Sequence, residues 1–150
     1  MFSTRLSSGQ MALYLKLLYM IHELNSHAEK IATEIVDIAF NIHKKLGPGL
    51  LESIYEKCFC YELAEGNIPF VKQQCVKIIY DNLVIDDGLR IDILVDDLII
   101  IELKAQETSH PVWEAQLLSY LKLTGKELGF LINFHVKLMK NGIKRMVHTQ

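Results

Sequence analysis

The chain has 150 residues, of which 50% are hydrophobic and 23% are charged, and its formal net charge is −2. This length supports one domain with a full core and is too short for two ordinary domains. The near-neutral charge excludes a generally basic surface, so any binding of nucleic acid must depend on a local patch or a bound cation.

The N-terminal segment is apolar from Ala12 to Ile21, except for Lys16. It is shorter than the roughly 20 residues of a membrane helix, and no small-x-small cleavage site follows it. We therefore expect no contact with a membrane. We expect residues 1–26 to form a helical extension that packs on the domain or on a partner subunit, as in a homo-oligomer, and residues 27–150 to form the domain.

Two helices are predicted next, separated by Gly47-Pro48-Gly49. In the first, apolar residues recur at steps of three and four from Ile31 to Leu46, which is typical of an amphipathic helix. The second ends at Gly66-Asn67, so the pair forms a helical hairpin. The residues expected to form its buried face are Leu51, Ile54, Tyr55, Cys58, Phe59 and Leu63.

The pattern changes to β-rich segments between Ile68 and Ala105. Three strands are predicted, with turns at Asp81-Asn82 and Asp96-Asp97, and the short connections indicate an antiparallel meander. Their expected ranges are about Phe70 to Tyr80, Leu89 to Val95 and Leu98 to Ala105.

A third helix and two further strands complete the predicted elements. Pro111 opens the helix, which runs to about Leu123, and Gly125 closes it. A fully apolar strand is then predicted from Leu128 to Phe134, followed by a turn at Asn141-Gly142 and a last short strand from Ile143 to His148.

Three cysteines, Cys58, Cys60 and Cys75, follow no metal-site pattern. They cannot all pair with one another, and they do not supply the four ligands of a zinc or iron–sulfur site. We interpret them as reduced thiols and expect a cytoplasmic protein.

Glu102 is the most informative single residue, because it places a charge in an apolar strand. Residues two apart in a strand share a face, so Ile100, Glu102 and Lys104 point one way while Ile101 and Leu103 point the other. A charge in such a strand costs several kcal/mol unless something compensates it. Glu102 therefore needs a partner.

Asp92, in the preceding predicted strand, can be that partner if the connecting loop has the right length. If Asp92 is opposite Glu102, then Val95 is opposite Ile99 and the loop is residues 96–98. Both carboxylates then lie on one face with their Cβ atoms about 5 Å apart. A two-residue loop without a bulge would place them on opposite faces, so the strand register tests this hypothesis.

Two close carboxylates repel each other unless a proton or a cation lies between them. An all-oxygen pair suits Mg²⁺ or Mn²⁺, which polarises a phosphoryl oxygen and lowers the pKa of a bound water. Lys104 can orient that water or stabilise developing negative charge. The spacing leaves an alternative open, in which Glu102 and Lys104 form a plain ion pair and Asp92 is solvated near a turn.

The pattern Asp92…Glu102-Leu103-Lys104, preceded by a helix and followed by a helix and a strand, resembles the PD-(D/E)XK nuclease superfamily. The segment Gly49-Leu50-Leu51-Glu52-Ser53-Ile54-Tyr55 is similar to the signature of its GxxExxY branch. The resemblance covers roughly residues 27–148, and its further matches are Arg90-Ile91-Asp92, Gln116-Leu117-Leu118-Ser119-Tyr120-Leu121-Lys122, Leu128-Gly129-Phe130-Leu131-Ile132-Asn133-Phe134 and Gly142-Ile143-Lys144-Arg145.

The resemblance implies an α/β fold with a restriction-endonuclease-like αβββαβ core, a central mixed sheet flanked by helices, and an extra N-terminal helix. It implies that Asp92 and Glu102 bind the metal, that Lys104 is the catalytic lysine and that Glu52 approaches the metal from the preceding helix. One departure is Trp113, which stands where the branch commonly has a histidine. Another is Ile91, at the position of the proline in the superfamily's name.

Gln116 and Tyr120 are four residues apart, hence on one face of the third helix. They resemble the Q-x-x-x-Y element of exonuclease-like members, which implies that both line the site. We expect Arg90, Lys122 and Arg145 to contact substrate. The alternatives are that Arg90 pairs with Glu52 and that the C-terminal basic residues form a solvated face.

The predicted function is therefore a nuclease that depends on Mg²⁺ or Mn²⁺ and hydrolyses phosphodiester bonds in nucleic acid, with DNA as the expected substrate. The first alternative is a nucleic-acid-binding or assembly module that keeps the fold with weak or no activity. The second is an oligomerising structural protein whose N-terminal helix contacts a partner.

Overall fold

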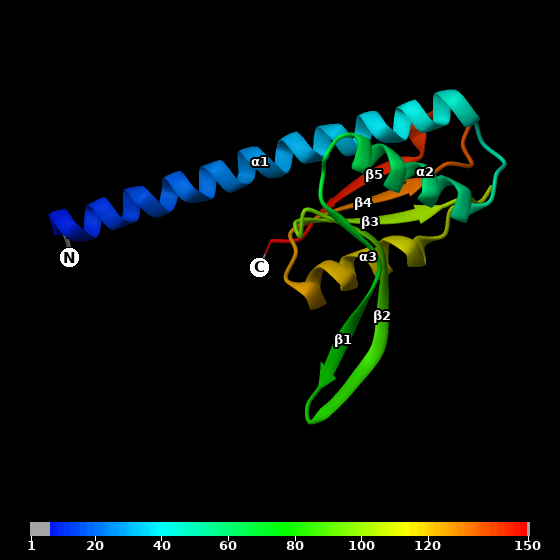
Figure 1. Cartoon of the computed structure of the whole chain (residues 1–150). Helices are drawn as coiled ribbons and strands as arrows, with labels where there is room; N and C mark the ends of the chain where they lie inside the picture. Colours follow the sequence, from blue (N-terminus) through cyan, green and yellow to red (C-terminus); the bar gives the residue numbers. More distant parts are fainter. Residues whose placement is uncertain (1–6, 150) are drawn as a thin grey trace.

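A five-stranded mixed sheet forms the centre of the computed structural model, which describes residues 7–149 (Figure 1). The strand order is β1-β2-β3-β4-β5, and only β3 and β4 run parallel. The strands are β1 (Phe70–Tyr80), β2 (Leu83–Val95), β3 (Ile99–Lys104), β4 (Leu128–Asn133) and β5 (Ile143–Val147). The helices are α1 (Ser8–Leu46), α2 (Glu52–Glu65), α3 (Pro111–Thr124) and the short 3₁₀ helix η1 (Met139–Asn141).

The two faces of the sheet bury two separate hydrophobic cores. Helices α1 and α2 cover one face, where Ile35 and Phe59 pack with Ile101. Helix α3 covers the other, where Leu117 packs with Ile100. Because α3 crosses the sheet between β3 and β4, those two strands are parallel. Figure 1 shows the resulting layers, which are the mixed sheet with flanking helices that the resemblance implies.

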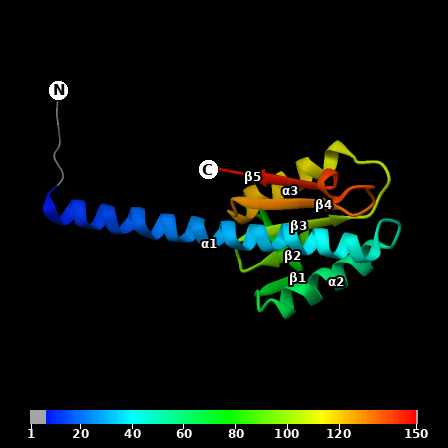
Figure 2. The ribbon, with the colours of Figure 1, turned by 90° about the horizontal axis from the view of Figure 1, so that it is seen from above.

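Helix α1 is longer than the predicted helix, since it runs without a break from Ser8 to Leu46. A capping box starts it: the Gln10 N–H donates to the Ser7 hydroxyl, and the Ser7 N–H donates to the Gln10 side chain. Its second half packs on the sheet, whereas the first half extends beyond the domain (Figure 2). Residues 8–23 are exposed, so they do not pack on the domain, and the other expected arrangement, packing on a partner subunit, stays a prediction.

No helix within residues 7–149 has both the length and the apolar character needed to cross a membrane.

Helix α2 buries three aromatic or aliphatic side chains at four-residue steps: Tyr55, Phe59 and Leu63. The Tyr55 ring stacks on Phe134, with ring centroids 4.3 Å apart. The prediction that Leu51 is buried is wrong, because this residue precedes the helix as its N-cap and is 72% exposed. Ile54 is also exposed, although it lies next to the buried face.

The β1–β2 hairpin is longer than predicted, and it projects away from the sheet (Figure 1). Strand β2 begins at Leu83 rather than Leu89, because Leu83 pairs with Tyr80 directly across the Asp81-Asn82 turn. A register shift follows between Val76 and Ile78. Each strand therefore continues well beyond the part that is covered by helices.

The β2–β3 hairpin has the predicted register. Val95 is opposite Ile99, and the pairing continues through Leu94 with Ile100. The loop is residues 96–98, in which both aspartates have positive φ, a conformation that Asp tolerates better than most residues. Extended by one more step beyond Ile93 and Ile101, this register places Asp92 opposite Glu102.

Gly142 lies at the start of β5, where the chain passes close to the end of β4. A Cβ atom there would be 2.2 Å from the Asn133 carbonyl oxygen and 2.8 Å from Val136 Cγ2. We expect Gly142→Ala to lower the free energy of unfolding by about 2–3 kcal/mol, because the backbone must shift. Urea denaturation measures this. Gly9→Ala is the control, since nothing lies within 4 Å of that position, and an unchanged Gly142→Ala variant would contradict the close approach.

Candidate functional site

Strands β2 and β3 separate at Asp92 and Glu102. Their pairing ends at Ile93 with Ile101. Beyond that point the Leu103 N–H donates to Asp92 Oδ2 at 2.8 Å, so a side-chain carboxylate takes the place of a main-chain carbonyl in the ladder. The Asp92 N–H in turn donates to Glu102 Oε1 at 3.4 Å. The two carboxylates therefore lie side by side in the opening between the strands.

The regular alternation of faces in β2 is interrupted at Asp92. Both Leu94 and Ile91 pack in the α3 core, although residues three apart in a regular strand point to opposite faces. Across from Asp92, Gln73 has φ 52° and interrupts the β1–β2 pairing. Because the alternation is broken at this bend, strand periodicity does not place Arg90 on the same face as Asp92. Arg90 is exposed.

Glu102 is buried, with 3% of its surface exposed, and its pKa is raised to about 8. Burial is the main cause, and the negative charge of Asp92 adds to it. Burial also raises the pKa of Asp92, against the opposing effect of the hydrogen bond from Leu103. Two full negative charges at this position therefore require a compensating positive charge.

Lys104 lies on the same side of the sheet as the carboxylates and supplies part of that positive charge. Its charge opposes the rise in pKa of Asp92 and Glu102. Its Nζ atom lies 5.7 Å from the centre of the Trp113 ring on α3, which is a cation–π contact. Trp113 thus packs beside the lysine at the position where the GxxExxY branch commonly has a histidine.

Helix α2 brings Glu52 to the site from its first turn. Burial raises the pKa of Glu52, and the nearby charge of Lys104 opposes this more strongly than Asp92 adds to it. The loop before the helix is held by Tyr55, whose hydroxyl donates to the Gly47 carbonyl at 2.6 Å and accepts from the Leu50 N–H at 3.2 Å. Glu52 therefore lies near the site, and Tyr55, one helical turn later, holds the loop that precedes the helix.

Gln73 belongs to the site, and the sequence analysis missed it. Its Nε2 donates to Glu56 Oε2 at 2.5 Å, and a hydrogen bond from its side chain lowers the pKa of Asp92. It therefore connects α2 with the carboxylate pair. Glu56, one helical turn after Glu52, could have been found from helix periodicity. Nothing in the local pattern marks Gln73.

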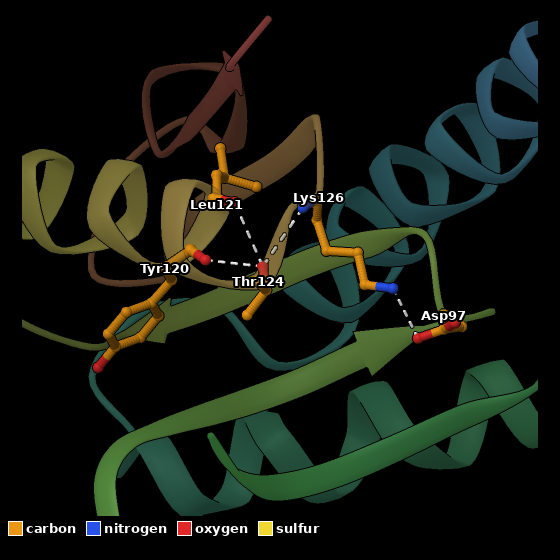
Figure 3. Close-up of polar contacts among 5 residues, drawn as sticks. All are labelled: Asp97, Tyr120, Leu121, Thr124 and Lys126. Atoms are coloured by element: carbon orange, nitrogen blue, oxygen red, sulfur yellow. Dashed lines mark hydrogen bonds and ion pairs between the residues drawn. The ribbon is translucent and has the colours of Figure 1, made fainter. Parts of the chain in front are cut away.

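Gln116 and Tyr120 lie together on α3, as predicted. The Gln116 Nε2 donates to the Tyr120 hydroxyl at 2.7 Å. Burial raises the pKa of Tyr120, and the charges of Glu102 and Asp92 add to this. Figure 3 shows its ring pointing from α3 toward the strands.

Lys122 and Arg145 are not brought to the carboxylates. Lys122 follows Tyr120 by two residues, about half a turn around α3, and is exposed. Arg145 on β5 binds Glu29 of α1, with Nη1 donating to Oε2 at 2.9 Å and Nη2 donating to Oε1. Among residues 7–149, no acidic side chain forms an ion pair with Arg90, so the alternative in which it pairs with Glu52 is not observed.

The acidic side chains available to a cation are the pair Asp92 and Glu102. Across the described part of the chain, no three His, Cys, Asp or Glu side chains form a metal-binding group, so Glu52 is near the pair without completing a triad. The Leu103 N–H points toward β2, and the carbonyl of a strand residue points the same way as its N–H. Because pairing with β2 has ended there, we expect this carbonyl to be directed into the same opening as the two carboxylates.

We expect the metal-free chain to lose stability as the pH rises from 5 to 8. The raised pKa of Glu102, about 8 against 4.5 for the free side chain, means that the folded chain holds a proton that the unfolded chain releases in this range. Urea denaturation in EDTA at several pH values measures the loss. In Glu102→Gln the pH dependence should be much weaker, whereas Glu107→Gln, at an exposed position, should behave as the wild type. A Glu102→Gln variant with the full wild-type pH dependence would contradict the assignment.

Comparison with protein-family models finds one that matches residues 29–146, and its description is the PD-(D/E)XK nuclease superfamily. The matched range includes Asp92, Glu102 and Lys104, together with all five strands except the end of β5. Comparisons with curated proteins and with solved structures find no match. The assignment to the GxxExxY branch stays a prediction.

Proposed function

The chain belongs to the PD-(D/E)XK nuclease superfamily, and we propose that it is a metal-dependent nuclease that hydrolyses phosphodiester bonds in DNA. The observation that carries this proposal is the pair of carboxylates, Asp92 and Glu102, at the point where β2 and β3 separate. Lys104 lies beside them on the same side of the sheet.

The donor set fits a hard divalent cation such as Mg²⁺ or Mn²⁺. Such ions take oxygen ligands, and Mg²⁺ is commonly held by one or two carboxylates with water completing the shell. Asp92, Glu102 and the Leu103 carbonyl would hold it, and Glu52 would approach it from α2. When bound, the cation supplies Lewis-acid chemistry, polarising a phosphoryl oxygen and lowering the pKa of a water molecule.

The chain's own groups act around that position. The Lys104 ammonium orients the attacking water and stabilises negative charge that develops on the phosphate. The Trp113 ring keeps this ammonium on the side of the carboxylates. Because the Tyr120 hydroxyl accepts from Gln116, its own hydrogen is free to donate to a phosphate oxygen.

The phosphate backbone of the substrate needs further positive charge, since the whole chain is slightly acidic. We place Arg90 in this role, because it is exposed and lies two residues from Asp92. Lys122 and Arg145 are left out of the proposed substrate contacts, because the first is on another face of α3 and the second is bound to Glu29.

We expect the wild-type chain to cleave labelled DNA in the presence of Mg²⁺ or Mn²⁺, and EDTA to abolish this cleavage. Glu102→Ala and Lys104→Ala should each lower the rate by at least about 100-fold, because the first removes a ligand of the cation and the second removes the ammonium that acts at the reacting phosphate. Single-stranded and double-stranded substrates are tested side by side.

The matched control for this experiment is Glu107→Ala, which removes an exposed carboxylate just beyond β3 and should cleave at the wild-type rate. Metal-dependent cleavage that persists in both site variants would show that the site is assigned wrongly. Salt-sensitive DNA binding without cleavage by the wild type would instead support a binding module on the same fold.

We expect Gln73→Gly to bind Mn²⁺ about tenfold more weakly than the wild type, because the variant loses the side chain that connects Glu56 with Asp92. Glycine accepts the positive φ at this position, so the backbone is preserved. Isothermal titration calorimetry with Mn²⁺ measures the affinity, and urea denaturation checks that the variant is folded.

The neighbouring variant Gln74→Ala is the control, since within the described structure its side chain has no hydrogen bond of its own. It should bind Mn²⁺ like the wild type. Equal Mn²⁺ affinity for Gln73→Gly and the wild type would remove Gln73 from the site.

A further inference from the structure

The first half of α1 stands outside the domain (Figures 1 and 2). Its residues are apolar on almost every side of the helix. Nine large hydrophobic side chains lie there, each at least 43% exposed. They are Met11, Leu13, Tyr14, Leu15, Leu17, Leu18, Tyr19, Met20 and Ile21. A helix with this composition is normally buried, and a contiguous exposed apolar surface marks an interaction site.

We propose that residues 8–27, which we name the association helix, pair in an antiparallel arrangement with the association helix of a second copy of this chain. The proposal concerns a surface outside the nuclease site and does not rest on the proposed function. It also gives the described part of the predicted N-terminal extension a role separate from the domain of residues 27–150.

Charge complementarity is the first argument for a second copy as the partner. Lys16 and Glu23 are the only Lys, Arg, Asp or Glu residues of the association helix. They are seven residues apart, so they lie on one face, about 10 Å apart along the axis, and neither forms an ion pair within residues 7–149. An antiparallel pair with two-fold symmetry places Lys16 of each copy against Glu23 of the other.

The direction of the pairing follows from the same charges. In a parallel pair, a residue at such a flanking position lies beside the residue about five positions along in the other helix. Lys16 would then lie beside Ile21 and Glu23 beside Ala28, so neither charge would gain a partner of opposite charge. The antiparallel pair makes two ion pairs instead. Next to this charged edge lie Leu13, Leu17 and Met20, which recur with the spacing of the buried positions of a coiled coil.

A groove at the base of the association helix provides the second argument. It has a volume of about 860 Å³, and its lining residues include Ile21, Asn25 and Ala28 of α1 with Leu98, Leu128 and Val147 at the end of the sheet. In the antiparallel arrangement, the first turns of the second helix pass residues 21–28. Apolar side chains of the second helix then pack both on the first helix and in this groove.

The wall of the groove is held by an ion pair between two turns of the chain. Lys126 Nζ donates to Asp97 Oδ1 at 2.8 Å, which connects the turn after α3 with the β2–β3 loop (Figure 3). At the C-terminal end of α3, Thr124 donates to the Tyr120 carbonyl at 2.7 Å (Figure 3). The groove is therefore part of the ordered domain and is present before a second copy binds.

Sedimentation velocity over a hundredfold range of protein concentration tests the proposal. We expect the wild type to form a dimer. Lys16→Glu and Glu23→Lys should each raise the dimer dissociation constant by at least about tenfold, because like charges then face each other twice. The double variant, Lys16→Glu with Glu23→Lys, should restore dimer formation, since it exchanges the two charges.

The control is Lys44→Glu, which makes the same charge change at an exposed position in the other half of α1. It should dimerise as the wild type does, and circular dichroism should show the same helix content in all variants. A wild type that stays monomeric at every concentration would overturn the proposal. So would single variants with the wild-type dissociation constant, or a double variant that associates no better than the singles.

Discussion

The hydrogen bond from the Leu103 N–H to the Asp92 carboxylate is the contact on which the site depends. It ends the β2–β3 ladder without leaving a buried N–H group unpaired, which would be costly in a strand this apolar. The strands can then diverge, and two carboxylates occupy the opening where a regular sheet would hold main-chain bonds. Gln73, with its positive φ, interrupts the pairing of β1 with β2 directly across from Asp92. The pairing of β2 is therefore interrupted at Asp92 on both of its edges.

The second constraint is electrostatic, since the carboxylates are held in a setting that favours their neutral form. Glu102 follows three buried isoleucines in β3, and the strand that positions it also removes it from water. The folded chain tolerates this because Lys104 and a set of hydrogen bonds act on the same groups. A divalent cation would compensate the negative charge of the two carboxylates more fully than Lys104 does. The burial of these carboxylates therefore favours the metal binding that the proposed function needs.

Helix α1 has two halves that serve different purposes. From Ile31 onward it buries a regular stripe against the sheet and so supports the face opposite the carboxylates. Before His27 it carries apolar side chains that the domain does not cover. The contact between Arg145 and Glu29 lies near the border between these halves, so Arg145, a residue expected at the substrate, binds a residue of α1.

The sequence by itself determined the elements whose signals are local. The Asp92–Glu102 register followed from the loop length, and the shared face of Gln116 and Tyr120 followed from helix periodicity. Only the tertiary structure decided the position of Gln73, the engagement of Arg145 with a residue far away in the chain, and the exposed first half of α1. The physical reason is that periodicity describes one element at a time and assumes that it is regular. A bend at Asp92 and a contact between distant segments depend on how elements meet.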